Sequence, residues 1–168
     1  VPLRRFLRRW LQIAGCAVLV SLGSMWMFPH SWISFGVLHA VAFMLPLLRW
    51  LRLGVLGWVL LGAVALLLPG FVAHPWFDDR WMNWTGLVTR LPVTQDYVPL
   101  LPWLGVTAWG QALGQGLLRH RPAWLQGPVP SGRAVRTLVW MGQHALSWYM
   151  LHQPVLIGMI TVAGWLMR

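Results

Sequence analysis

Residues 93–118, VTQDYVPLLPWLGVTAWGQALGQGLL, decide the fold of this 168-residue chain. A polar, turn-forming start is followed by Pro99 and Pro102, and then by an uncharged run to the end of the stretch. Proline suits the first turn of a helix, where its missing N–H has no intrahelical partner, and Asp96 suits the N-cap position before that turn. The 21 residues 98–118 would form a helix about 31 Å long, enough to cross a hydrocarbon core of about 30 Å. The stretch therefore predicts a membrane-spanning helix.

The composition extends this prediction to the whole chain. Hydrophobic residues make up 58% of the sequence and charged residues only 10%, against about 25% charged in a soluble domain. All thirteen basic residues are arginine, and the net charge is +10. Such a charge on a soluble protein would suggest a nucleic-acid partner, but arginines that flank apolar spans set membrane orientation instead. We therefore expect a lipid bilayer as the partner and no nucleic acid.

The apolar runs predict an all-α fold, a polytopic membrane bundle of about five transmembrane helices in a single domain over residues 1–168. The predicted spans cover residues 10–28, 32–50, 53–73, 98–118 and 138–167, with an outer loop at 74–97 and a cytoplasmic linker at 119–137. Pro154 should kink the last span near Met150. Gly110 and Gly114 lie one helical turn apart, which predicts a close helix–helix contact and a face for a homo-oligomer.

The arginines predict the orientation of these spans. A cytoplasmic N-terminus places ten of the thirteen arginines inside, as the positive-inside rule requires. These ten are Arg4, Arg5, Arg8, Arg9, Arg49, Arg52, Arg119, Arg121, Arg133 and Arg136. The basic start also resembles a signal peptide, but the uncharged run that follows it is long enough to span. We expect an integral protein of the bacterial inner membrane, because an all-arginine basic set favours a bacterial source.

Polar side chains inside the predicted spans are the candidate functional residues, because they are costly in lipid. They are His39, Gln111, Gln115, Gln143, His144, Ser147, His152 and Gln153. Each has a structural alternative, a hydrogen bond to a neighbouring helix. The sequence contains no Gly-rich phosphate loop, no nucleophile elbow and no histidine pair at metal-ligand spacing with carboxylates nearby, so no metal site is predicted.

Helix geometry places two of these histidines at one depth. At about 1.5 Å per residue, His39 lies about 10 Å and His152 about 9 Å below the outer surface. We predict that both face the bundle interior and line one cavity open to the outside, beneath Asp96. The alternative is two unrelated helix–helix hydrogen bonds.

Three motifs resemble a known family. They are TQDYVPLLPWLG at residues 94–105, FGVLH at 35–39 and LHQPV at 151–155. In this order and spacing they are similar to motifs of bacterial membrane proteins described as heparan-alpha-glucosaminide N-acetyltransferase-like. That family normally begins with an Asp-x-x-Arg-Gly clause and further spans that supply the histidine considered catalytic. The chain starts past that region, so the resemblance implies the C-terminal part of a longer domain.

The resemblance also implies a reaction. Acetyl-CoA would serve as co-substrate at the cytoplasmic face, and its acetyl group would pass to an amine or hydroxyl of a sugar or glycan outside. A histidine would act as general base or acyl carrier, and the candidate catalytic residues are His39, His152 and Asp96. The candidates for binding the CoA phosphates are Arg119, Arg121, Arg133 and Arg136. Two other functions stay open, a small-molecule transporter and a non-catalytic membrane scaffold. The absence of acids from the spans counts against proton-coupled transport.

Overall fold

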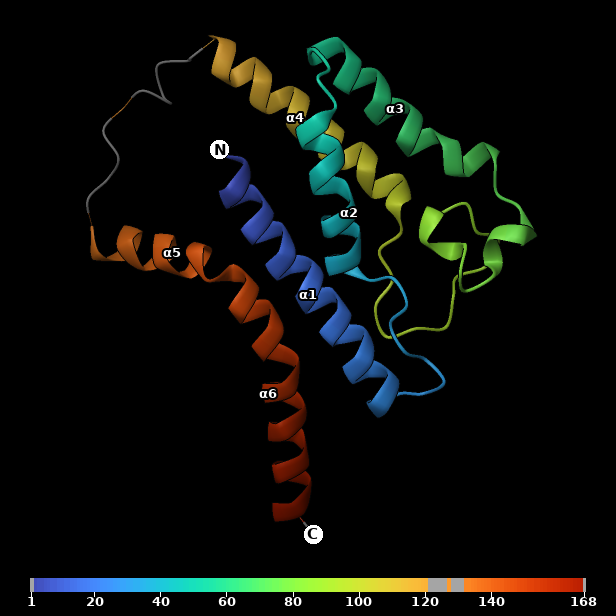
Figure 1. The fold of residues 1–168 in the computed structure, drawn as a ribbon. Helices are drawn as coiled ribbons and strands as arrows, with labels where there is room; N and C mark the ends of the chain where they lie inside the picture. The colour runs from blue at the N-terminus through green and yellow to red at the C-terminus, as the bar shows by residue number, and fades with distance from the viewer. Residues whose placement is uncertain (1, 121–126, 128–131, 168) are drawn as a thin grey trace. The chain divides into compact units, whose positions relative to one another are not determined.

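The computed structural model describes residues 2–120, 127 and 132–167. The chain divides into two compact units, Val1–Pro122 and Ala123–Arg168, and each is described by itself. Every regular element in the described residues is helical, which confirms the predicted all-α class (Figure 1). Two of these helices, α1 and α6, are long and apolar enough to cross a membrane by length and composition. The five spans and the single domain stay predictions.

The first unit contains four α-helices and two short 3-10 helices in its described residues. They are α1 (Leu3–Met27), α2 (Val37–Trp50), α3 (Val55–Phe71), η1 (Pro75–Asp78), η2 (Asn83–Thr85) and α4 (Leu100–His120). In α4 the backbone at Leu101 is not helical, so the regular helix begins at Pro102, in the first-turn position that proline favours. α2 and α3 are shorter than the spans predicted at 32–50 and 53–73.

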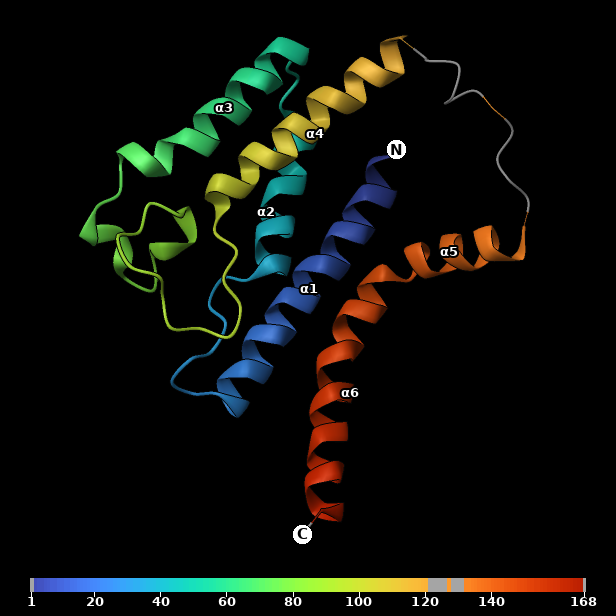
Figure 2. The same cartoon turned by 180° about the vertical axis from the view of Figure 1, so that it is seen from behind.

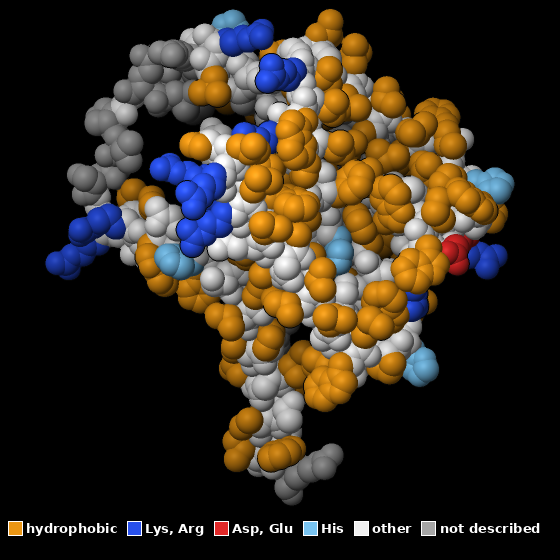
Figure 3. Space-filling view, viewed as in Figure 1, with side chains coloured by type: hydrophobic (Ala, Val, Ile, Leu, Met, Phe, Trp, Pro, Cys, Tyr) orange, Lys and Arg blue, Asp and Glu red, His pale blue; other side chains and the backbone are white. Residues whose placement is uncertain are grey.

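The helices of the first unit pack in the order α1, α2, α4, α3 (Figures 1 and 2). Ala40 and Met44 of α2 form a buried cluster with Ala65 of α3 and Leu104 of α4. Many large apolar side chains point outward instead, as Figure 3 shows, and Leu56 for example is 70% exposed. An apolar exterior around a small core is expected of a helix bundle that faces lipid.

Glycines hold α3 and α4 together. A Cβ atom on Gly105 of α4 would lie 2.6 Å from Leu66 Cγ and 2.8 Å from the carbonyl oxygen of Gly62, both on α3. Trp109 lies against Gly62, and its Nε1–H donates a hydrogen bond to the Val59 carbonyl at 3.1 Å. The two helices can therefore approach closely only because both contact positions lack a side chain.

This contact corrects the predicted helix–helix contact at Gly110 and Gly114. No heavy atom of the described residues lies within 4 Å of a Cβ atom built on either glycine, apart from the glycine's own helical backbone and its chain neighbours. The prediction named the wrong glycines of α4 because the partner helix could not be identified from one helix alone. A homo-oligomer through Gly110 and Gly114 stays a prediction.

The turn between α1 and α2 is bound to α1 by two serines. Ser21 Oγ donates to the Ile33 carbonyl at 2.7 Å, and Ser24 Oγ accepts the Ile33 N–H at 2.9 Å. Ser24 and Ile33 are both buried. Both backbone polar groups of Ile33 are thus paired within the protein.

The second unit contains α5 (Arg133–Gln143) and α6 (Ala145–Leu166) in its described residues. The span predicted at 138–167 is therefore interrupted, but the interruption lies at His144, with φ −105° and ψ 19°. α6 continues through Pro154, and the predicted kink near Met150 stays a prediction. The His144 ring donates from Nδ1 to the Trp140 carbonyl at 2.8 Å, and a side chain that binds its own helix in this way competes with the regular ladder. Residues 121–126 and 128–131 of the predicted linker lie outside the described residues.

Candidate functional site

Asp96 binds the start of α2. Its Oδ2 accepts the N–H of Val37 at 2.9 Å, so a residue 59 positions later in the chain satisfies one free donor at that helix N-terminus. The prediction that Asp96 caps the helix after it was therefore wrong. A Cβ atom on Gly36 would overlap the Asp96 carboxylate and lie 2.9 Å from Ile33 Cγ2, so this approach requires glycine.

The residues next to Asp96 fasten the same loop to the α1–α2 turn. Thr94 Oγ1 donates to the Trp32 carbonyl at 3.0 Å. Gln95 makes two bonds to Ser31, from its backbone N–H to the carbonyl at 3.0 Å and from Nε2 to Oγ at 2.8 Å. The TQDY segment, residues 94–97, is thus a tertiary clamp on the segment that leads into α2.

His39 lies one turn into the helix that Asp96 caps, and both of its ring nitrogens have partners. Nδ1 accepts the Gly36 N–H at 3.3 Å, and Nε2 lies 3.2 Å from Ser21 Oγ on α1. Since the Gly36 N–H can only donate, Nδ1 carries the lone pair and Nε2 carries the proton. Ser21 Oγ therefore accepts from His39 while donating to the Ile33 carbonyl. His39 does not activate the Ser21 hydroxyl as a nucleophile in this arrangement.

Aromatic rings border His39. The Phe35 ring lies 5.7 Å from the His39 ring and 6.1 Å from Trp84, and Phe43 lies 5.5 Å from Trp84, between centroids. Trp84 belongs to η2, in the loop between α3 and α4. The histidine is half-buried, held between α1 and a wall of rings rather than directed away from the helices.

Two residues of the loop between α3 and α4 have shifted pKa values. The Tyr97 hydroxyl donates to the Asn83 carbonyl at 2.7 Å, and burial, with a contribution from the Asp78 charge, raises the pKa of Tyr97 to about 12. Asp78 accepts hydrogen bonds from the Thr89 hydroxyl and from the N–H groups of Thr89 and Arg90. The side-chain bond from Thr89 is the main cause of the lowered pKa of Asp78. Both residues order the loop that ends in the TQDY segment.

His152 lies in α6 of the second unit, where its Nδ1–H donates to the Tyr149 carbonyl. Its side chain is exposed. Because His39 and His152 belong to different units, the cavity predicted between them and beneath Asp96 stays a prediction. His39 and Asp96, by contrast, meet at the start of α2 through the backbone of Gly36 and Val37.

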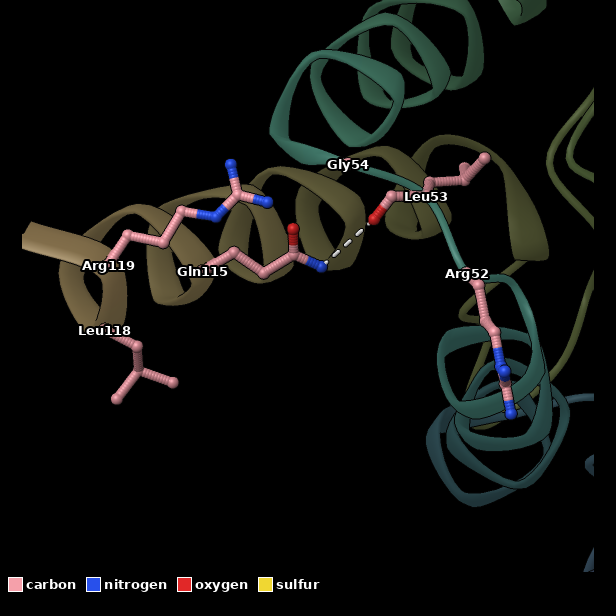
Figure 4. Close-up of a pocket in the computed structure, with 6 residues that line it drawn as sticks. All are labelled: Arg52, Leu53, Gly54, Gln115, Leu118 and Arg119. Atoms are coloured by element: carbon pink, nitrogen blue, oxygen red, sulfur yellow. Dashed lines mark hydrogen bonds between the residues drawn. The ribbon is translucent and has the colours of Figure 1, made fainter.

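An open cavity of about 510 Å³ lies at the other end of α2 (Figure 4). It is lined by Arg52, Leu53, Gly54, Gln115, Leu118 and Arg119. Gln115 Nε2 donates to the Leu53 carbonyl at 3.2 Å and so joins the α2–α3 connection to α4. Arg52 is not among the predicted site residues, although its place just after a predicted span is the same signal that indicates Arg119.

The other three predicted arginines are not among the described residues of the first unit. Arg121 lies outside the described residues, and Arg133 and Arg136 are on α5 of the second unit. No group of three or more His, Cys, Asp or Glu side chains in the described part of the chain could hold a metal ion.

The first unit thus has a half-buried histidine at one end of α2 and a cavity with two arginines at the other. Together with the apolar exterior, this defines a helical membrane protein with polar sites at both ends of one helix. Residues 1–154 match the family model described as heparan-alpha-glucosaminide N-acetyltransferase, catalytic, and the chain belongs to this family of membrane acetyltransferases. The predicted family is thereby confirmed. No curated protein and no solved structure matches the chain.

Proposed function

We propose that the chain acts in a membrane-bound acyltransferase, which takes an acetyl group from acetyl-CoA at the cytoplasmic face and delivers it to an amine or hydroxyl of a sugar outside. The family match over residues 1–154 is the observation that carries this proposal. The layout of α2 supports it, because His39 and Arg52 lie thirteen residues apart, a rise of about 20 Å if the helix is extended to both. One helix then connects a donor end with an acceptor end.

The donor end is the cavity of Arg52 and Arg119. All three acidic residues of the chain, Asp78, Asp79 and Asp96, lie in the outer loop. No acidic side chain near either arginine in the sequence can neutralise it, so an anion from outside the chain is favoured. Guanidinium groups bind phosphate oxygens in a bidentate fork, and we assign the phosphates of CoA to this pair. Arg121, Arg133 and Arg136 stay candidates for the same role.

The acceptor end is His39. Its Nδ1 holds the lone pair, and the bond from the Gly36 N–H that occupies it is long, at 3.3 Å. If that bond opens, Nδ1 can accept the proton of an attacking amine or hydroxyl while Ser21 keeps the Nε2–H in place. Asp96 acts indirectly: it accepts the Val37 N–H and so fixes the start of α2, on which His39 lies. His152 is the second candidate for the proton acceptor.

Binding and transfer are tested separately. Calorimetry on the detergent-purified chain should give a dissociation constant for acetyl-CoA that rises at least tenfold in R52Q and in R119Q, since a hydrogen bond to a charged group contributes about 1.5–3 kcal/mol. The control R90Q removes the same charge from the outer loop and should bind normally. Unchanged binding in R52Q and R119Q would remove the cavity from the donor site.

The transfer step is followed with labelled acetyl-CoA and glucosamine in sealed membrane vesicles. His39→Ala should abolish labelling of the sugar while leaving acetyl-CoA binding intact. Full labelling in this variant would exclude His39 as the proton acceptor. Accumulation of unmodified sugar in the vesicles would instead favour a transporter.

A further inference from the structure

The first turns of α1 carry a basic stripe on one face. Arg5, Arg8, Arg9 and Gln12 follow the spacing i, i+3, i+4, i+7, which places them on one side of a helix. All four side chains are exposed, and the structure gives none of them a hydrogen bond or ion pair with another described residue. We call these four residues the basic stripe.

A different face of α1 packs on α2. Trp10 Nε1–H donates to the Ala42 carbonyl at 2.8 Å. The Phe6 ring meets Trp50 edge-on at 5.9 Å, and the Arg49 guanidinium lies over Phe6 at 4.6 Å from its centroid. Phe6 and Trp10 are one turn apart, so they define the packed face, and the basic stripe lies about a third of a turn away from it at about 100° per residue.

The stripe needs an anion that the chain's acidic side chains do not supply nearby. Guanidinium groups at i, i+3 and i+4 repel one another and destabilise a helix unless a counter-charge lies between them. The chain has three acidic residues, and the first of them, Asp78, follows α3. A ligand with phosphate oxygens would match the fork geometry of several arginines at once.

The surface that continues from the stripe is apolar and exposed. Leu19 lies seven residues after Gln12, on the same face, and Leu22 follows one turn later. They are 62% and 58% exposed, and both belong to a helix that is long and apolar enough to cross a membrane. A soluble phosphate ester could use the arginines but not this surface, whereas a phospholipid uses both.

We propose that the basic stripe of α1 is a binding site for the headgroup of an anionic phospholipid, with the acyl chains along Leu19 and Leu22. The phosphate oxygens accept hydrogen bonds from Arg5, Arg8 and Arg9, and Gln12 contacts the glycerol end of the headgroup. The lipid neutralises the stripe and holds this end of α1 at the membrane surface. This site is separate from the Arg52–Arg119 cavity.

Native mass spectrometry of the detergent-purified chain tests the site, with phosphatidylglycerol as the probe and phosphatidylcholine as the neutral comparison. Wild-type protein should retain phosphatidylglycerol far more strongly. Arg5→Gln should weaken its binding about fivefold, since an arginine near an anionic headgroup contributes about 1 kcal/mol. Arg5→Lys keeps the charge and should lose less of the phosphatidylglycerol binding. A loss confined to R5Q is then due to the missing charge and not to misfolding caused by a change at this position.

Arg90→Gln is the matched control. Arg90 is exposed and lies in the loop between α3 and α4, so its removal has the same effect on net charge and leaves the basic stripe intact. It should weaken binding less than twofold. Equal losses in R90Q and R5Q, or equal retention of the two lipids, would overturn the proposal. Displacement of phosphatidylglycerol by millimolar inorganic phosphate alone would assign the stripe to a soluble anion instead and would also overturn it.

Discussion

Replacing Gly105 by alanine should drive α3 and α4 apart. The added methyl carbon would lie 2.6 Å from Leu66 Cγ and 2.8 Å from the carbonyl oxygen of Gly62. Carbon atoms at van der Waals contact are about 3.5–4.0 Å apart, so the helices must separate by roughly 1 Å or Leu66 must leave its position. The carbonyl of Gly62 is backbone, which makes a local adjustment insufficient.

The cost follows from overpacking, which typically destabilises by about 1–3 kcal/mol. Gly110 supplies the control within the same helix, because no described atom lies within 4 Å of a Cβ atom there beyond its own helical backbone and its chain neighbours. Gly110→Ala should be neutral or stabilise by up to about 1 kcal/mol, the gain in helix propensity. The difference between the two variants should therefore be about 1–4 kcal/mol.

Unfolding of the two variants in one detergent, followed by circular dichroism against temperature and against denaturant, measures this difference. G105A should unfold at a lower temperature and a lower midpoint than wild type, while G110A should not. Equal stability of G105A and G110A would refute the assignment of the α3–α4 contact to Gly62 and Gly105. A loss in G110A alone would return the contact to the Gly110–Gly114 face.

Three further predictions concern the loop between α3 and α4. Asp96→Ala should lower the free energy of thermal unfolding by about 0.5–2 kcal/mol, because the Val37 N–H loses its acceptor. D96N should lower it less, and an unchanged stability of D96A would exclude the cap. In Y149F, which leaves Tyr97 as the one tyrosine of the chain, the phenolate absorbance should titrate near pH 12. The free energy of unfolding should fall as the pH rises from about 10 toward 12, because Tyr97 loses its proton first in the unfolded state. Titration at the ordinary pKa would contradict the burial of Tyr97. Alkaline phosphatase fused after Thr89 should be active and the same reporter fused after Gly127 inactive, and the reverse pattern would invert the proposed orientation.

The sequence predicted the class of fold because an apolar run with arginines at its ends indicates a membrane helix without reference to the rest of the chain. It selected the right segment in TQDY but the wrong partner for Asp96. Local capping rules relate a residue to the helix that follows it, while the Val37 N–H lies 59 residues earlier. Only the folded chain brings the two together, and the only trace of this in sequence is that Gly36 stands where a side chain would collide with the carboxylate.

The interruption of the last helix shows a second limit. Proline is the strongest local signal for a kink, and Pro154 drew the prediction, but the sequence did not predict the interruption of the helix at His144. At His144 the imidazole binds the Trp140 carbonyl, and a side-chain bond of this kind to the helix's own backbone is not signalled by the residue type alone. In the same way Arg52 became a site residue only through the approach of α4.

The pairing of Ile33 with Ser21 and Ser24 determines how deep the α1–α2 connection can lie. A turn in the hydrocarbon region is unstable when its peptide groups depend on water, because each unpaired group costs several kcal/mol there. Both polar groups of the Ile33 peptide backbone are bound by side chains of α1. Ile33 itself therefore needs no hydration and can lie below the headgroups, which lets α2 begin within the bilayer a few residues later.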